Sequence, residues 1–138
     1  MLMKFKIVTP DGVIYEDEIE SVSLPTLNGE ITILPHHIPL ISVIKAGEIR
    51  IVKDNHETGI AVSSGVIEVR ESGEVIVIAD TAERAEHIDI ERAEQARQRA
   101  EELMKQEKFA DDRQFATLQA QMEKELARIR VGKKYRNI

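Results

Sequence analysis

Glycine and proline are confined almost entirely to the first half of this chain. Six of the seven glycines and all four prolines lie before residue 74, and the next glycine after Gly73 is Gly132. These residues mark turns and interrupt regular structure. The chain of 138 residues therefore predicts a region of short, turn-linked segments followed by a region of long, uninterrupted ones.

The first region has the pattern of β-strands. Apolar and polar residues alternate at 4–8 and 47–52, and β-branched residues dominate 59–69 and 73–80. Turn signals at 9–12 and 71–73 separate strand segments. Short strands with a turn signal about every ten residues predict a sandwich or barrel whose inner faces bury Ile and Val.

The second region has the pattern of two helices. Asp89 is expected to cap the first helix, and Asp112 the second, because a carboxylate can accept a backbone N–H of the first turn. Each helix carries one apolar stripe at helical spacing. The stripes are Ala93, Ala96, Ala100 and Leu103 in the first helix, and Phe115, Leu118, Met122, Leu126 and Ile129 in the second.

The two stripes predict an antiparallel hairpin. The expected fold class is α+β, with a β-sandwich domain at 1–84 and a helical hairpin domain at 85–138. The connection at 105–114 contains neither glycine nor proline. One long helix, with the hairpin opened out, is therefore also compatible with the sequence.

Charge is divided as unevenly as the turn-formers. Residues 1–80 hold 6 basic and 13 acidic side chains, whereas residues 81–138 hold 13 basic and 12 acidic ones. The net charge of −6 argues against general nucleic-acid binding. No acidic residue follows Glu125, so the chain closes on a basic end made of Arg128, Arg130, Lys133, Lys134 and Arg136.

Several classes of chemistry have no support in the sequence. The absence of cysteine excludes thiolate catalysis and cysteine zinc sites, and the four histidines match no metal-binding spacing. No phosphate-binding glycine loop is present. There is no apolar run long enough for a membrane span and no secretory signal pattern. We therefore expect no metal, no required cofactor and a cytoplasmic, non-enzymatic protein.

Two features of the sequence are typical of binding sites. His36 and His37 lie between Pro35 and Pro39, which predicts a rigid surface loop. On the first helix Asp89, Arg92 and Arg99 share a face, which the hairpin would bring level with Lys124 and Arg128. This group could form a basic pocket. The residues alone favour the alternative, a solvated face with Arg97–Glu101 and Arg99–Glu102 ion pairs.

Three segments together resemble the epsilon subunit of the bacterial F-type ATP synthase. They are GEITILPHHIPLI at 29–41, SSGVIEV at 63–69 and IDIERA at 88–93, in the same order and over the whole chain. The family form usually has a glycine in place of Thr32 and often one in place of His36. The resemblance implies a flattened β-sandwich followed by a helical hairpin.

The resemblance also implies a function. Such a subunit is a non-catalytic part of the rotor, peripheral at the cytoplasmic face of the membrane, and couples rotation to ATP synthesis. Its sandwich contacts the gamma subunit and the c-ring, with Glu30 and His37 as rotor contacts. Its helices open to reach the catalytic beta and alpha subunits and inhibit ATP hydrolysis, which here would use the basic end.

In some family members the closed hairpin binds ATP as a regulatory ligand, with or without Mg²⁺. The motif residues that match are Ile88, Asp89, Arg92 and Ala93, and the further basic positions are Arg99, Lys124 and Arg128. Lys124 stands where the family has an arginine, which removes bidentate contact with phosphate at that position. The competing hypotheses are a free-standing β-sandwich adaptor with a helical tail and, with least support, a small enzyme.

Overall fold

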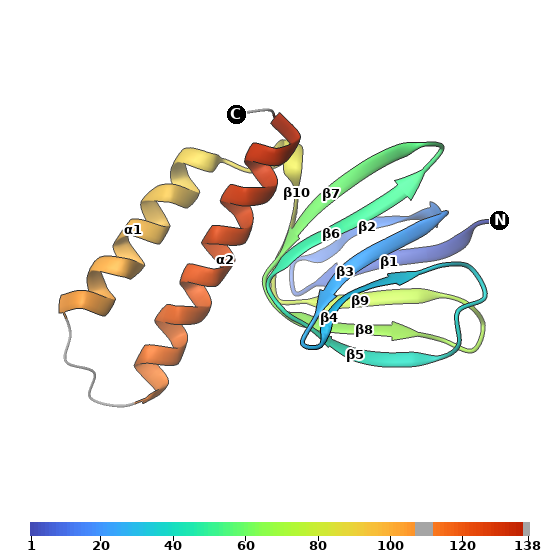
Figure 1. Ribbon diagram of the computed structural model, residues 1–138, viewed down its shortest axis with the longest axis horizontal. Coiled ribbons are helices and arrows are strands. Elements are labelled where there is room, and N and C mark those ends of the chain that lie inside the picture. The colour runs from blue at the N-terminus through green and yellow to red at the C-terminus, as the bar shows by residue number, and fades with distance from the viewer. Residues whose placement is uncertain (107–111, 137–138) are drawn as a thin grey trace.

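The structure is a computed structural model that describes residues 1–106 and 112–136. The described residues form a β-sandwich followed by two helices, which confirms the predicted fold class (Figure 1). The strands are β1 (Met3–Thr9), β2 (Gly12–Ile19), β3 (Ser21–Thr26), β4 (Gly29–Ile33), β5 (Leu40–Ile44), β6 (Gly47–Lys53), β7 (His56–Val62), β8 (Gly65–Val69), β9 (Val75–Ala79) and β10 (Ala82–Arg84). A 3₁₀ turn, η1 (Ala85–His87), then leads to α1 (Ile90–Gln106) and α2 (Asp112–Arg136).

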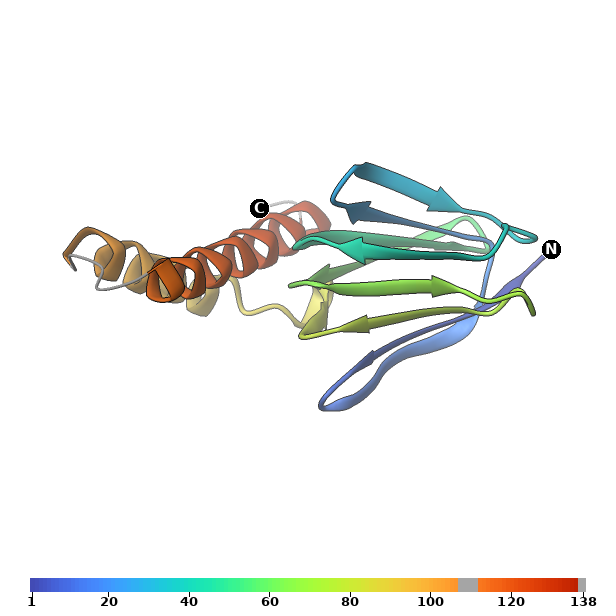
Figure 2. The ribbon, with the colours of Figure 1, turned by 90° about the horizontal axis from the view of Figure 1, so that it is seen from below.

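One continuous sheet folds over to make both layers of the sandwich. Its strand order is β10-β7-β6-β3-β5-β8-β9-β1-β2, and β4 pairs with β3. Neighbouring strands are antiparallel except β1 and β9, which are parallel. β3 makes the corner because the start of the strand pairs with β6, whereas Thr26 at its end pairs with Ile44 of β5. Figure 2 shows β5, β8, β9 and β1 as neighbouring rungs with β6 and β7 behind them.

The core between the layers is built from Ile, Val and Leu, as the alternation predicts. Ile49 and Ile51 of β6 are buried against residues of the facing layer such as Ile67 and Val77. Phe5 and Tyr15 supply the aromatic contribution, with ring centroids 6.0 Å apart. The predicted turns also form: Gly12 and Gly73 have φ of 119° and 93°, in the region that favours glycine.

The helices form an antiparallel hairpin that touches the sandwich mainly through the end of α2. Asp89 caps α1 as predicted, since its Oδ1 accepts a hydrogen bond of 3.1 Å from the backbone N–H of Arg92. Ile88 and Val131 pack with Ala61 and Ala85 in a second apolar cluster outside the main core. In Figure 1 α2 lies between α1 and the strands, and the hairpin projects from one end of the sandwich.

The predicted helical stripes are only partly correct. Ala93 and Ala100 are fully buried, but Leu103, Phe115 and Leu126 are 44%, 41% and 45% exposed. The buried residues of α2 include Glu125, Ala127 and Val131 instead. The reason is that α2 packs against α1 on one side and against the sandwich on another, so a single stripe does not describe its covered surface. Residues 107–111 of the predicted connection, and the side chain of Asp112, lie outside the described residues.

Ile67 and Ile78 offer a direct test of the layer assignment. They lie on the neighbouring strands β8 and β9, with exposed fractions of 0% and 57%. Ile67→Ala should lower the free energy of unfolding by about 2–5 kcal/mol, because it leaves a cavity between the layers. Ile78→Ala should change it by less than about 0.5 kcal/mol. Urea denaturation of the two variants checks this, and equal losses would contradict the assignment.

Candidate functional site

Arg128 of α2 stands at the contact between the hairpin and the sandwich. Its Nε donates to Glu83 of β10 at 2.8 Å, and its Nη1 donates to Glu125 at 2.8 Å. The side chain of Glu125 is only 5% exposed, so Arg128 balances a buried carboxylate. Burial alone would lower the pKa of Arg128, but the ion pairs with Glu83 and Glu125 outweigh it and raise that pKa. Arg128 is thus a fixed cation shared by two carboxylates.

Arg92 and Arg99 are two further cations predicted for the site, and they share one face of α1. Lys133 Nζ lies 3.2 Å from Glu94 Oε1, which fixes how the two helices face each other. Arg92 lies about 200° around α1 from Glu94, and Arg99 lies within about 20° of Arg92. Both are therefore on the flank opposite the Lys133–Glu94 pair.

The basic flank is our name for Arg92 and Arg99 of α1 together with Lys124 and Arg128 of α2. Lys124 and Arg128 lie about 40° apart around α2, on the side that pairs with Glu83 of the sandwich. Among the described residues, Arg92, Arg99 and Lys124 form no ion pair, whereas the predicted Arg97–Glu101 pair is present at 2.9 Å. Of the four cations, Arg128 is held in ion pairs, whereas the other three have no ion-pair partner among the described residues.

The other residues predicted for this site have structural positions. Asp89 is the N-cap of α1, as described above. Ile88 and Ala93 are 1% and 0% exposed, so a ligand on the surface of the closed hairpin would not touch them. Ile88 packs with Val131 in the apolar cluster between α2 and the sandwich.

A cavity lies between the middle of α2 and the end of the sandwich. Its volume is about 590 Å³. Lys124 and Gln121 line it from α2, and loop residues that include Leu27, Lys45 and Thr81 line it from the sandwich. The closed hairpin therefore leaves α2 unpacked against the sandwich at this level.

The basic end is already engaged within the chain. Lys134 Nζ lies 2.9 Å from Glu48 Oε1 on β6, and Arg136 Nη2 donates to the backbone oxygen of Glu86 at 2.8 Å. Lys133 and Arg128 pair as described above. Of the five predicted residues of this end, Arg130 is exposed and has no ion pair among the described residues. In the closed hairpin, the sandwich and α1 hold this end.

The predicted rotor contacts are Glu30 and His37, and the expectation that both lie in the proline-bounded loop is wrong for Glu30. Glu30 lies in β4, where it forms an ion pair with Arg50 of β6. His37 lies beyond the other end of β4, in the loop that contains both prolines. The remainder of β4, residues 31–33, extends the chain between the two residues.

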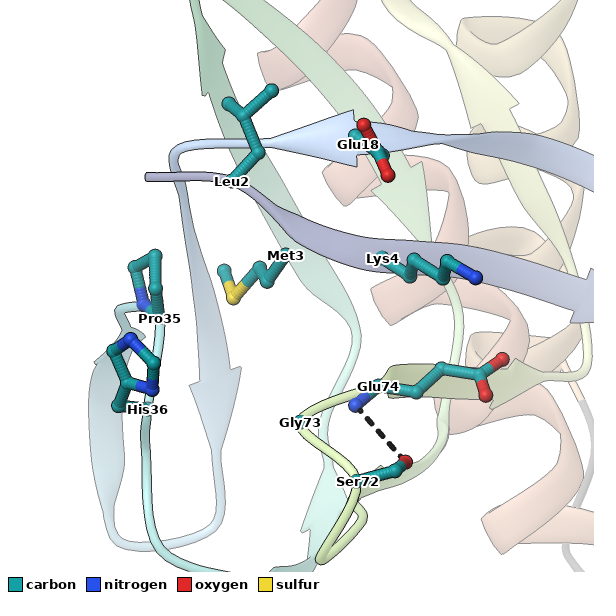
Figure 3. A pocket seen from close by; sticks show the side chains of 9 residues that line it. All are labelled: Leu2, Met3, Lys4, Glu18, Pro35, His36, Ser72, Gly73 and Glu74. Atoms are coloured by element: carbon teal, nitrogen blue, oxygen red, sulfur yellow. Dashed lines mark hydrogen bonds between the residues drawn. The ribbon is translucent and has the colours of Figure 1, made fainter.

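The loop itself contains a tight turn. The backbone N–H of His37 donates to the oxygen of Leu34 at 3.2 Å, and His36 has φ of 68°. Proline at the second position and a left-handed third position define a type II turn, which favours glycine at the third. This explains physically why glycine suits position 36. Figure 3 shows His36 and Pro35 beside a hollow of about 360 Å³ that Leu2, Lys4 and Glu74 also line.

An exposed apolar row on the sandwich was missed by the sequence reasoning. Val43 of β5 pairs with Val66 of β8, which pairs with Ile78 of β9, and the three are 49%, 39% and 57% exposed. Ile41, two residues before Val43, is 74% exposed. The signal was present: β9 reads VIVIA, apolar on both faces, where a half-buried strand would alternate. Contiguous exposed apolar surface marks interaction sites.

The described residues contain no group of three or more His, Asp or Glu side chains placed to hold a metal ion. Among the same residues, no helix is both long and apolar enough to cross a membrane.

Comparison with solved structures identifies the same fold in mitochondrial ATP synthases. A chain of the Euglena gracilis enzyme, in a structure of OSCP, F1 and the c-ring, has a TM-score of 0.72 at 18% identity, over 88% of this chain and 76% of that one. A chain of the Tetrahymena thermophila central stalk and c-ring has a TM-score of 0.66 at 11% identity, over 96% and 95%. At these identities the likeness is one of fold.

Sequence comparisons give the family. The ATP synthase epsilon chain of Dehalococcoides mccartyi is 39% identical over 134 residues, 97% of this chain and 94% of that one. The epsilon chain of Bacillus subtilis is 48% identical over 102 residues, 74% and 76% of the two chains. Family models of the ATP synthase delta/epsilon chain match residues 2–85 as the beta-sandwich domain and residues 86–133 as the long alpha-helix domain. The chain therefore belongs to the epsilon chains of the ATP synthase delta/epsilon family.

Proposed function

We propose that this chain is a non-catalytic rotor subunit of a proton-translocating ATP synthase, held peripherally at the cytoplasmic face of the membrane. Residues 1–84 would bind the gamma subunit and the c-ring and couple rotation to ATP synthesis. Residues 85–138 would regulate ATP hydrolysis. Family membership supports this proposal, as do the structural neighbours, whose assemblies contain a central stalk or a c-ring.

The observation that carries the coupling role is the apolar row of Ile41, Val43, Val66 and Ile78. Its members are aligned across three strands and lie on the outer face of the sandwich. Burial of such a row against a partner stabilises a rigid, non-polar contact, through which rotation can be transmitted. We assign this row to the gamma subunit. Glu30 and His37 then contribute polar contacts to the rotor from two separate places on the sandwich.

The apolar row can be tested by charge insertion. The double variant Val66→Asp/Ile78→Asp should lose co-purification with the gamma subunit, because each carboxylate would be buried without a partner. Val13→Asp is the matched control, since Val13 is also 57% exposed but lies on β2, away from the row. Circular dichroism melts should show all variants folded. Undiminished binding of gamma by the double variant would exclude this row as the contact.

Regulatory ATP binding at the basic flank of the hairpin is the second part of the proposal. Guanidinium groups pair well with phosphate oxygens. Arg92 and Arg99 have no ion-pair partner among the described residues, and Lys124 adds a third cation from α2. Arg128 can join only if phosphate replaces Glu83 or Glu125. Because ATP would bridge the two helices, it would stabilise the closed hairpin by mass action.

Calorimetric titration with ATP, with and without Mg²⁺, tests the flank. Arg92→Ala should weaken binding by about tenfold, the cost of losing a charged hydrogen bond. Lys124→Arg should tighten it, since arginine can hold phosphate in two places. Arg130→Ala should have no effect, because Arg130 lies about 160° around α2 from Arg128. Absence of any heat with the wild-type protein at millimolar ATP would end this part of the proposal.

Inhibition of hydrolysis is the third part. In the opened form the basic end, Arg128, Arg130, Lys133, Lys134 and Arg136, would meet an acidic surface of the catalytic alpha and beta subunits. Those cations would first have to leave Glu48, Glu83 and Glu94. Because one set of carboxylates replaces another, the closed and opened states would have similar free energies. Ligands or partners could then shift their populations.

Truncation separates coupling from inhibition. A chain that ends before Ile88 should still bind gamma and the c-ring, but the assembled enzyme should hydrolyse ATP faster than with the full-length subunit. The reason is that the main core lies within the first 84 residues, so the sandwich keeps its fold and loses only the helices. Hydrolysis rates of the two reconstituted complexes, at equal occupancy, provide the measurement. Equal rates would show that the helices do not inhibit.

A further inference from the structure

The last turn of α2 fits a notch on the outer face of the sandwich. The notch is centred on Gly59 of β7, and the ring of Tyr135 lies directly over it. A Cβ at residue 59 would fall 2.1 Å from Cε2 and 2.4 Å from Cζ of that ring. Real contacts of this kind do not occur, so the ring fits only because residue 59 has no side chain.

Polar groups surround the notch and bind the same turn. The hydroxyl of Tyr135 donates to Glu57 Oε2 at 3.0 Å, and Lys134 Nζ pairs with Glu48 on the adjacent strand. Lys134 Nζ also lies 5.1 Å from the centre of the Tyr135 ring. Burial of the ring and the hydrogen bond to Glu57 both raise the pKa of Tyr135. Shape, hydrogen bonding and charge thus all match one segment, 134–136.

The rest of the contact between α2 and the sandwich is sparse. Val131 packs with Ala61, Ala85 and Ile88, and one cluster of ion pairs surrounds Arg128. Towards the middle of the helix, at Ala120–Lys124, the cavity of about 590 Å³ separates α2 from the sandwich loops. Tyr135 in the notch and Val131 therefore supply apolar contacts of α2 with the sandwich on one side of that cavity.

We propose that Tyr135 in the Gly59 notch is the latch that keeps the hairpin closed. Release of the ring frees Lys134 and Arg136 in the same step, because all three belong to one helical turn. If the proposed inhibitory role is correct, the notch and the catalytic subunits compete for the same residues. The latch itself does not depend on that role and can be measured on the isolated chain.

The absence of cysteine allows a clean measurement of opening. Ala61 is 3% exposed and lies beneath α2, in the cluster that joins the hairpin to the sandwich. In the variant Ala61→Cys, a thiol reagent can reach residue 61 only when the hairpin opens, so the labelling rate reports even a rare open state. Val77→Cys, in the main core, is the control for unfolding of the whole sandwich.

In the Ala61→Cys background, Tyr135→Ala should raise the labelling rate at least about tenfold, through loss of the half-buried ring. Tyr135→Phe removes only the hydroxyl and should raise it about threefold. Gly59→Ala should act like Tyr135→Ala, because its methyl group fills the notch while Tyr135 remains. Arg130→Ala should leave the rate unchanged, and labelling at residue 77 should stay slow in every variant.

The labelling rates distinguish a latch from unfolding of the whole sandwich and from a hairpin that Tyr135 does not hold. The latch is wrong if Tyr135→Ala labels residue 61 at the wild-type rate, or if the wild-type chain already labels there as fast as an unfolded peptide. It is also wrong if the rates at residues 61 and 77 rise together, since the whole sandwich would then be unfolding. Faster labelling at residue 61 alone supports the latch. If such a variant still inhibits ATP hydrolysis as the wild type does, the latch stands and the proposed inhibitory role fails.

Discussion

The arrangement of the molecule depends on close approach between small residues where the helices meet the sandwich. Ala61 and Ala85 lie against Val131, and they let α2 come near β7. At the same level, a Cβ on Gly132 would lie 2.9 Å from Ile90 Cγ1, so α1 and α2 also approach through a missing side chain. Because both contacts are short, the charged groups of α2 reach carboxylates on three other elements. Larger residues at these positions would separate those pairs.

Local sequence patterns predicted the strands and helices better than they predicted which faces of these elements are buried. Turn-formers, strand alternation and the Asp89 cap depend on neighbours in sequence, and each appears in the structure. The apolar face of α2 failed because that helix has two packing partners, which no single periodicity encodes. Leu126 is exposed, whereas Glu125 is buried. A buried glutamate is intelligible only with Arg128 beside it, a contact that the spacing permits but does not require.

The candidate site was predictable to a similar degree. Spacing predicted that Arg92 and Arg99 would lie level with Lys124 and Arg128, but it could not reveal that Glu83 on β10 already binds Arg128. That contact crosses from the sandwich to the hairpin and depends on tertiary structure. The apolar row was visible as strands with two apolar faces, yet a doubly buried strand gives the same pattern. Only the fold decides which face remains uncovered.

The hairpin projects from the sandwich and is held near one end, so its geometry is that of a lever. From Val131 to the first turn of α2 the helix extends by roughly 28 Å, at 1.5 Å per residue. A rotation of about 10° at the held end would move the far end by roughly 5 Å. Side-chain rearrangements of ångström size at the contact with β7 are therefore enlarged several-fold along the helix. A rigid helix in this position converts a small change at the sandwich into a displacement of several ångströms at the far end of the hairpin.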